Sequence, residues 1–493
     1  MGGDGKGGKR RSGYADFAQV HAEVTGKIGG KRGPADGLLG LQDDCWTRIA
    51  PDLARSRGSY LAALGEEAPY LDCCGFFGTG PLAFDHPSLT GDEYRERLYQ
   101  AARYRISLSD FWPEEMAHFV RAFREVVGEP YYLPWLFLVE GGALACENAL
   151  KAAFDWKVRT NIRKGLIHGD VSEERRPLGT RVISFERAFH GRSGYTLSLT
   201  HTRSEKYKFF PKFDWFRIDP PFERYDNEHN VINAEEVRGQ QERAITGIKR
   251  ILRQYPDDVA AIIVEPMQAE GGDRYLPVSF FHELRALCDE NDMILIYDEI
   301  QVGFGSAGRM WMHEYFGEKA RPDIVTFAKK GQLAGILASY ERFQTVDSVF
   351  GSASESLSRI NSTWGGNPAD VVRSTAILQA IHNQRIDGRT LLEHVRYAGD
   401  ELLHRLQDLC RRYPTLIENP RGCGLLAAFD VRDPAWRGPL WEEIWKERLL
   451  SLVCGTQGIR FRPHLDMTIE EVEDATARLD RALQRFAGSV ARR

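Results

Sequence analysis

The sequence lacks the features that mark several common classes of protein. It has eight cysteines among 493 residues but no Cys-X-X-Cys pair, which argues against a zinc ribbon and against a dithiol redox site. It contains no run of about twenty apolar residues, so we expect no membrane-spanning helix and no membrane partner. The first residues, MGGDGKGGKRR, lack the apolar stretch of a secretory signal. These absences together predict a reduced, cytoplasmic protein.

The chain also lacks a large excess of charge of one sign. Lysine and arginine number 65, aspartate and glutamate number 70, and the net charge is −5. A nucleic-acid-binding protein usually carries a basic excess or a basic stripe, so no nucleic-acid partner is expected. Apolar residues make up 42% and charged residues 27%, which is typical of a globular protein.

Short apolar runs alternate with helix-like stretches from about residue 130 to residue 330. Each run is continuously apolar, as in strands buried on both faces. The runs are Trp135–Val139, Val182–Phe185, Ala260–Val264, Met293–Tyr297 and Ile324–Phe327, and the intervening helical segments include Leu144–Arg159 and Phe280–Glu290. This pattern predicts an α/β fold with a mostly parallel sheet, in which ligands bind beyond the carboxyl ends of the strands.

The length of the chain requires more than one folded unit. Residues 1–33, rich in Gly, Lys and Arg, are predicted to form a flexible tail. Residues 34–100 contain many turn residues and are expected to pack with a small domain and cover the site. A large domain is predicted over residues 101–367. Residues 368–493 read as a smaller α+β domain, with one or two helices over Arg373–Leu409 and strands beyond them.

Two charged residues follow predicted strands that are successive in the sequence. Lys329, inside the stretch FAKK, is a candidate Schiff-base nucleophile, whereas most lysines are surface charges. Asp298 directly follows ILIY, and a carboxylate there needs a cation or hydrogen-bond donors. A protonated pyridine nitrogen would serve, because pyridoxal phosphate enzymes combine a lysine with an acid at the ring nitrogen. The alternative is that Asp298 caps a following helix.

Glycines between a strand and a helix suggest a phosphate site. Gly141, Gly142 and Ala143 precede a long helical stretch whose free N–H groups could bind an anion, although a plain turn is equally consistent. Phe189 follows another strand and could stack on a planar cofactor or lie in the core. The GxGxxG match at 303–308 does not follow its strand directly, as a dinucleotide site requires.

The order of these motifs resembles that of the class III, pyridoxal phosphate-dependent aminotransferases of fold type I. The resemblance runs from about residue 40 to the end and is closest to the L-lysine 6-aminotransferases. The stretches that carry it are FLVEGGALACENALKAAFDWK (137–157), FERAFHGRSGYTLSLT (185–200), FPKFDW (210–215), VEPMQAEGGDRYLP (264–277), YDEIQVGFG (297–305), PDIVTFAKK (322–330), NSTWGGN (361–367) and IRFRPHL (459–465).

The resemblance implies a large domain whose mostly parallel sheet is sandwiched by helices, a smaller α+β domain, and a homodimer with shared active sites. It implies pyridoxal 5'-phosphate as the cofactor and no metal. The roles implied for the cofactor are covalent attachment to Lys329, a contact of Asp298 with the ring nitrogen and of Gln301 with the ring hydroxyl, phosphate binding by Gly142 and Ala143, ring stacking by Phe189, and a contact of Thr363 with the other subunit's phosphate.

The resemblance also implies the substrates, L-lysine and 2-oxoglutarate. Arg192 would bind the carboxylate far from the reacting amine, Arg460 the α-carboxylate of glutamate or 2-oxoglutarate, and Glu270 would neutralise Arg460 while lysine is bound. Asn361 is a further candidate for substrate contact. The expected ping-pong reaction yields L-glutamate and 2-aminoadipate 6-semialdehyde, which cyclises to piperideine-6-carboxylate. An arginine that is masked in one half-reaction and free in the other suits both substrates.

Other functions remain open from the sequence. Ala328 and the segment KGQLAGILAS depart from the family pattern, and Gly331 removes a side chain near the cofactor. The donor could therefore be ornithine, a diamine or a modified lysine. A racemase or decarboxylase of the same fold would have little use for a Glu270–Arg460 pair, and a scaffold protein would not need Lys329 and Asp298.

Overall fold

The computed structural model describes residues 48–490 except 130, 172, 173, 175 and 352–358, together with a few positions before residue 48. The predicted tail, residues 1–33, lies almost entirely outside the described residues; within it, β1 (Lys27–Ile28) pairs antiparallel with β2 (Lys31–Arg32). Among the described residues, none of the helices has the length and apolar character needed to cross a membrane.

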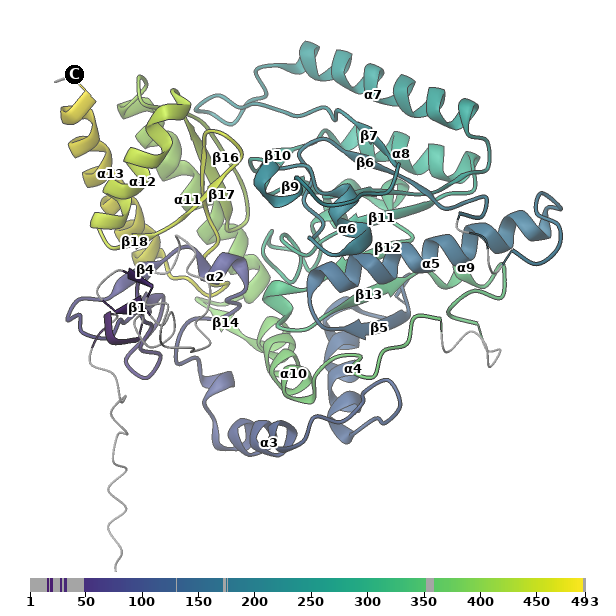
Figure 1. Ribbon diagram of the computed structural model, residues 1–493. Helices are drawn as coiled ribbons and strands as arrows, with labels where there is room; N and C mark the ends of the chain where they lie inside the picture. Colours follow the sequence, from purple (N-terminus) through teal and green to yellow (C-terminus); the bar gives the residue numbers. More distant parts are fainter. Residues whose placement is uncertain are drawn as a thin grey trace, which may run out of the picture.

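A seven-stranded sheet forms the centre of the larger part of the molecule (Figure 1). Its order is β5-β13-β12-β11-β8-β6-β7. All neighbours are parallel except β13, which runs antiparallel to both β12 and β5. The predicted mostly parallel sheet is thus confirmed, while β7 and β13 are additional strands. The bounds are β5 (Trp135–Val139), β6 (Arg181–Phe185), β7 (Phe216–Ile218), β8 (Val259–Val264), β11 (Ile294–Asp298), β12 (Ile324–Phe327) and β13 (Ala334–Ala338).

Helices cover both faces of this sheet. Helix α5 (Gly142–Arg163) packs on β8, β12 and β13, and α7 (Ala234–Gln254) and α8 (Val278–Glu290) cover the opposite face (Figure 1). In β8, Ala261 and Ile263 join the core under α5, whereas Ile262 and Val264 join the core under α8. Burial of both faces explains why the strands read as continuous apolar runs.

A second, antiparallel sheet lies beside the large one. Its order is β16-β17-β20-β19, and α11 (Leu391–Arg412) packs on β16 and β17. Helix α13 (Ile469–Val490) contacts α11 and α12 (Arg437–Lys446). The stretch at 373–409 forms two helices rather than one, because α10 (Pro368–Asn383) ends before the Asp387–Gly388 turn. The strands are β16 (Ile417–Cys423), β17 (Leu426–Val431), β19 (Leu452–Cys454) and β20 (Gly458–Phe461).

The N-terminal segment packs against this second part. Strand β4 (Tyr70–Asp72) pairs with β3 (Tyr60–Leu61) and, in parallel, with β18 (Leu449–Leu450), so a purple and a yellow part of the chain lie side by side in Figure 1. Helix α2 (Gly75–Gly78) follows β4 and reaches toward the large sheet. This arrangement brings the segment after β4 to the place where the two sheets face each other.

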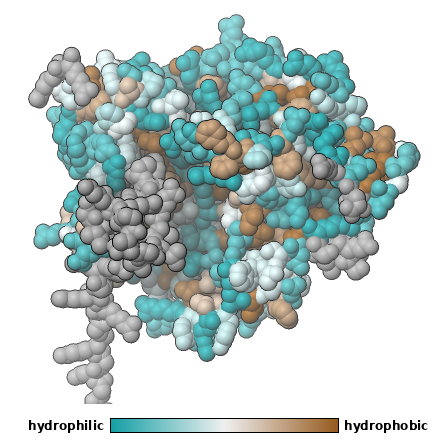
Figure 2. Space-filling view, viewed as in Figure 1, coloured by the Kyte–Doolittle hydropathy of each residue, from teal (hydrophilic) through white to brown (hydrophobic). Residues whose placement is uncertain are grey.

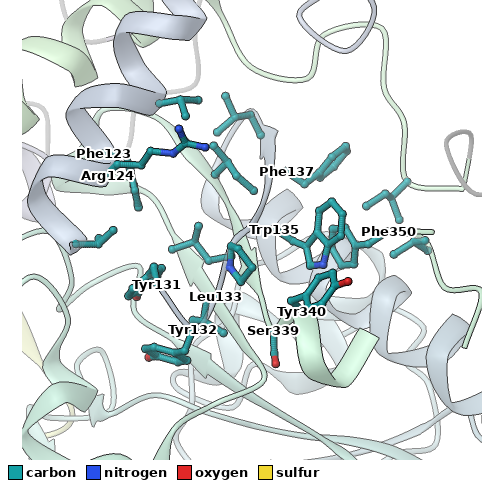
Figure 3. Close-up of a pocket in the computed structure, with 18 of the residues that line it drawn as sticks. Phe123, Arg124, Tyr131, Tyr132, Leu133, Trp135, Phe137, Ser339, Tyr340 and Phe350 are labelled. Atoms are coloured by element: carbon teal, nitrogen blue, oxygen red, sulfur yellow. The ribbon is translucent and has the colours of Figure 1, made fainter. Parts of the chain in front are cut away.

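An apolar groove of about 2300 Å³ lies along the edge strand β5. It is bordered by α4 (Glu114–Val127), α9 (Tyr340–Phe343) and residues 360–365. Figure 3 shows Trp135 and Phe350 side by side, and their rings stack at 5.9 Å and 17°. Apolar patches, brown in Figure 2, also interrupt the mostly hydrophilic surface of the molecule.

Candidate active site

The carboxyl ends of β11 and β12 bring Asp298 and Lys329 to one edge of the large sheet. Asp298, at the end of β11, is the register partner of Thr326 in β12, and Lys329 follows Thr326 by three residues. The backbone of Lys329 has a φ of +50°, a conformation that non-glycine residues rarely adopt, and it turns the chain sharply out of the strand. The Lys329 Nζ donates a hydrogen bond to Gln301 Oε1. The structure therefore places these three predicted residues together.

Asp298 is buried and surrounded by donors. His190 Nδ1 lies 2.7 Å from its Oδ2, and the Cys146 thiol donates to the same oxygen at 3.4 Å. Its Oδ1 accepts from the Thr326 hydroxyl at 3.2 Å and from the Ile300 N–H at 3.1 Å. These donors offset the cost of burying a carboxylate. No helix follows Asp298 directly, so the interpretation of Asp298 as a helix cap is wrong.

The lysine amine lies in a strongly cationic environment. Burial, followed by the charges of Arg460 and Arg462, lowers the pKa of Lys329 to about 7. A lysine with this pKa is about half neutral near pH 7 and so a competent nucleophile, whereas an ordinary lysine is almost fully protonated there.

Glu270 and Arg460 form an ion pair near this edge. Glu270 follows the short strand β9 (Met267–Gln268), Arg460 lies in β20, and Arg460 Nη2 donates to Glu270 Oε2 at 2.9 Å. Burial alone would raise the pKa of the Glu270 carboxyl, but the charges of Arg460 and Lys206 hold this pKa below its ordinary value. Arg460 is 4% exposed, and its Nη1 also lies 3.5 Å from Asp273 Oδ1. The two residues that the resemblance links as a switch are thus in direct contact.

The remaining predicted residues occupy less enclosed positions. Phe189 is half-buried, with the guanidinium carbon of the exposed Arg192 5.8 Å from its ring centre. Asn361 and Thr363 are exposed on the loop before α10, and the described part of the chain gives the Thr363 side chain no hydrogen bond. Trp364, next to Thr363, stacks on Arg105, which in turn pairs with Glu140 at the end of β5.

The comparison with known proteins decides the family. Residues 46–483 match the family model for class III aminotransferases. The chain belongs to this family. The aminotransferase is 41% identical to the L-lysine-epsilon aminotransferase of Mycobacterium tuberculosis strain H37Rv over 436 residues, which cover 88% of this chain and 92% of that protein. It is 38% identical to the L-lysine-epsilon aminotransferase of Streptomyces clavuligerus, covering 89% of this chain and 90% of that protein.

Solved structures agree with the fold of this aminotransferase. The lysine aminotransferase from M. tuberculosis in the internal aldimine form superimposes with a TM-score of 0.82 at 38% identity, covering 95% of this chain and 99% of that one. Class III aminotransferases depend on pyridoxal 5'-phosphate (PLP), and PLP is the cofactor of this enzyme. The predicted fold class, the resemblance to class III aminotransferases and the predicted enzyme class are thereby confirmed.

The residues present fit PLP. The buried His190 Nε2 and Gln301 Nε2 have no hydrogen-bond partner among the described residues, so polar atoms next to Asp298 and Lys329 remain available to a bound group. Helix α5 starts at Gly142 without a side-chain cap, so its first N–H groups are free for an anion. A Cβ at Gly142 would lie 2.9 Å from Ile300 Cδ1, so a larger residue there would push the Ile300 side chain aside, whereas glycine leaves room for this close approach of α5. An amine, a carboxylate and an anion site therefore converge.

The lowered lysine pKa predicts a pH-dependent stability of the cofactor-free protein. Between pH 7 and the ordinary value of 10.5, the unfolded chain carries a proton on Lys329 that the folded chain lacks, so the free energy of unfolding rises with pH. In Lys329→Met this contribution disappears. We expect the stability of the wild type relative to this variant to rise by roughly 1–2 kcal/mol from pH 7 to pH 9 in urea titrations. Lys208→Met, at an exposed lysine, is the control, and a pH-independent difference would contradict the lowered pKa.

Sequence reasoning missed several residues of the site. Glu265 is buried, and burial, opposed by His190, raises the pKa of its carboxyl to about 7. It accepts the N–H groups of Phe189 at 3.0 Å and Ala269 at 3.1 Å and so ties two site loops together. His190, which directly follows Phe189, comes after β6, and β8 separates β6 from the strand that ends at Asp298, so adjacency of strands did not link the two residues. No sequence signal pointed to Lys206, whose contact with Glu270 depends on loop geometry.

Proposed function

We propose that this aminotransferase transfers the ε-amino group of L-lysine to 2-oxoglutarate. The Glu270–Arg460 pair at 2.9 Å is the observation that carries the proposal. The reacting carbon of the donor has no carboxylate beside it, whereas that of the acceptor does. A buried arginine that a displaceable carboxylate masks suits an enzyme that binds both. The relatives named for lysine support the choice of donor.

The positions of the candidate cofactor-binding residues support the following proposed roles. Bound PLP supplies an electron sink for the charge left when a proton leaves the substrate carbon next to nitrogen. Lys329 Nζ holds the cofactor at rest and, once free, moves this proton. Asp298, supported by His190, keeps the ring nitrogen protonated. The remaining contacts we propose are those of Gln301 with the ring hydroxyl, of Gly142 and Ala143 with the phosphate, and of Phe189 with the face of the ring.

The surroundings of Glu270 favour a donor with a carboxylate over a diamine. Lys206 pairs with Glu270, and the charges of Arg203 and Arg192 act on Lys206. Arg460 and Arg203 also act on Glu270, so three cations lie near this one carboxylate, and Arg192 lies near Lys206. The distant ammonium of a diamine would be repelled here, whereas the carboxylate of lysine would find Arg192. Asn361 is proposed as a further substrate contact.

We also propose that two copies form the active unit. The groove along β5 exposes a contiguous apolar surface, and the loop that bears Asn361 and Thr363 borders it. A second copy of the chain on this face would bury the groove and bring Thr363 to the partner's cofactor phosphate. The division into a large domain at 101–367 and a small domain at 368–493, and the cytoplasmic location, stay predictions.

A single half-reaction tests the donor. PLP-loaded protein is mixed with L-lysine alone, the visible absorbance of the bound cofactor is followed, and the product is trapped with o-aminobenzaldehyde. We expect loss of absorbance and a trapped cyclic imine identified by mass and chromatography as the 6-carboxylate. The isomeric 2-carboxylate would mean transfer from the α-amine. Bleaching by ornithine or a diamine but not by lysine would replace the donor while keeping the class.

A further inference from the structure

Glu270 has a second cationic partner that the arginine pair alone does not explain. Lys206 ends the short helix η2 (Ser204–Lys206), and its Nζ donates to Glu270 Oε1 while Arg460 donates to Oε2. The side chains of Lys206 and Glu270 are only 13% and 21% exposed. The Lys206 Nζ also lies 4.9 Å from the centre of the ring of Phe189, the residue proposed to contact the cofactor.

The two partners of Glu270 have different needs. Arg460 keeps a second acidic neighbour, because its Nη1 lies 3.5 Å from Asp273 Oδ1. Glu270 has Lys206 as its second partner: among the described residues its cationic contacts are Arg460 and Lys206, so without Lys206 it would depend on Arg460 alone. When a dicarboxylate binds Arg460, Glu270 must leave that guanidinium. A half-buried carboxylate without a counter-ion is costly, and this cost would weaken dicarboxylate binding.

We propose that Lys206 keeps Glu270 paired while Arg460 binds the carboxylate of the amino acceptor. This inference rests on the proposed function, in which Glu270 and Arg460 separate in one half-reaction. Lys206 is a positioning residue, since it acts through Glu270 and not on the reacting atoms. Its effect belongs to the dicarboxylate half-reaction, because Glu270 stays on Arg460 when the amine donor is bound.

Equilibrium binding of glutarate separates this role from a structural one. Glutarate is an unreactive dicarboxylate, and its affinity for PLP-loaded protein can be measured by isothermal titration calorimetry. We expect Lys206→Met to weaken binding about tenfold and Lys206→Arg to restore most of the affinity. The rate of cofactor bleaching by L-lysine alone should change little. Lys208→Met, at an exposed lysine on the same loop, is the matched control.

A double-mutant cycle tests whether Lys206 acts through Glu270. With Glu270→Gln there is no charge to keep paired, so adding Lys206→Met should weaken glutarate binding by no more than about twofold. A tenfold loss on this background would show that Lys206 binds the dicarboxylate itself and would overturn the proposal. Parallel losses of glutarate affinity, of the rate of bleaching by lysine and of thermal stability would reduce Lys206 to a structural role.

The wild type separates this proposal from the proposed function. If the wild type did not bind glutarate, the proposed acceptor would fail and the role of Lys206 with it. If the wild type bound glutarate normally and Lys206→Met left that affinity unchanged, only the role of Lys206 would be overturned.

Discussion

Lys329→Ala is expected to lower kcat by roughly 10⁴-fold, since it removes both the amine that holds the cofactor and the group that moves the substrate proton. The fold should survive, because the variant removes a buried amine whose pKa is already lowered by burial and two arginines. Borohydride reduction followed by intact-mass measurement gives a readout that does not depend on turnover. The wild type should retain the mass of the cofactor after denaturation, and the variant should not.

The adjacent lysine provides the control. Lys330 is also buried, and its Nζ donates to the Gly80 carbonyl at 2.8 Å and to the Pro463 carbonyl at 2.7 Å. Lys330→Met should therefore lower stability but retain the cofactor mass after reduction. Covalent retention in Lys329→Ala and its loss in Lys330→Met would reverse the assignment of the two lysines.

Asp298→Asn is expected to lower kcat by roughly 10³-fold. The amide keeps nearly the same shape and can still accept the Thr326 and Ile300 hydrogen bonds, but it has no negative charge to keep the ring nitrogen protonated. The effect should therefore fall on kcat, with a small change in stability. Steady-state kinetics and thermal unfolding of the PLP-loaded variant measure the two quantities separately.

Glu299→Gln removes a buried carboxylate from the next position. Glu299 accepts the backbone N–H groups of Met312 at 3.0 Å and His313 at 2.8 Å, so its contacts are structural. This variant should be less stable and yet turn over normally. Equal activity losses in Asp298→Asn and Glu299→Gln would show that burial, and not the position of the charge, explains the effect.

The central sheet could be predicted because its strands carry their own signal. Strands buried on both faces become continuous apolar runs, and β8 and β12 were found almost to the residue. Strand β13 was missed because it follows Lys329 within a few residues and returns antiparallel, a connection that apolar periodicity does not report. Gly331 in that connection has a packing reason: a Cβ there would lie 2.7 Å from the Phe304 ring.

The site was predictable only where residues follow strand ends or match a motif. Lys329, Asp298 and Gln301 either follow a strand end or belong to a family motif, and the structure places them together. Glu265 and Lys206 met neither, since their contacts come from loops whose paths depend on tertiary packing. The hydrogen bond between His190 and Asp298 joins residues 108 positions apart, a relation that one sequence does not contain.

The adjacent lysines 329 and 330 join the reactive amine to the packing of two other segments of the chain. The Lys330 amine, on the residue next to Lys329, binds the carbonyls of Gly80, in the N-terminal segment after β4, and of Pro463, just after β20, and so ties both segments to the large sheet. A displacement of either segment that Lys330 binds would shift the backbone that carries Lys329. The position of the N-terminal segment and the orientation of the Lys329 amine therefore depend on each other. An enzyme redesigned for bulkier donors would have to preserve the two Lys330 hydrogen bonds.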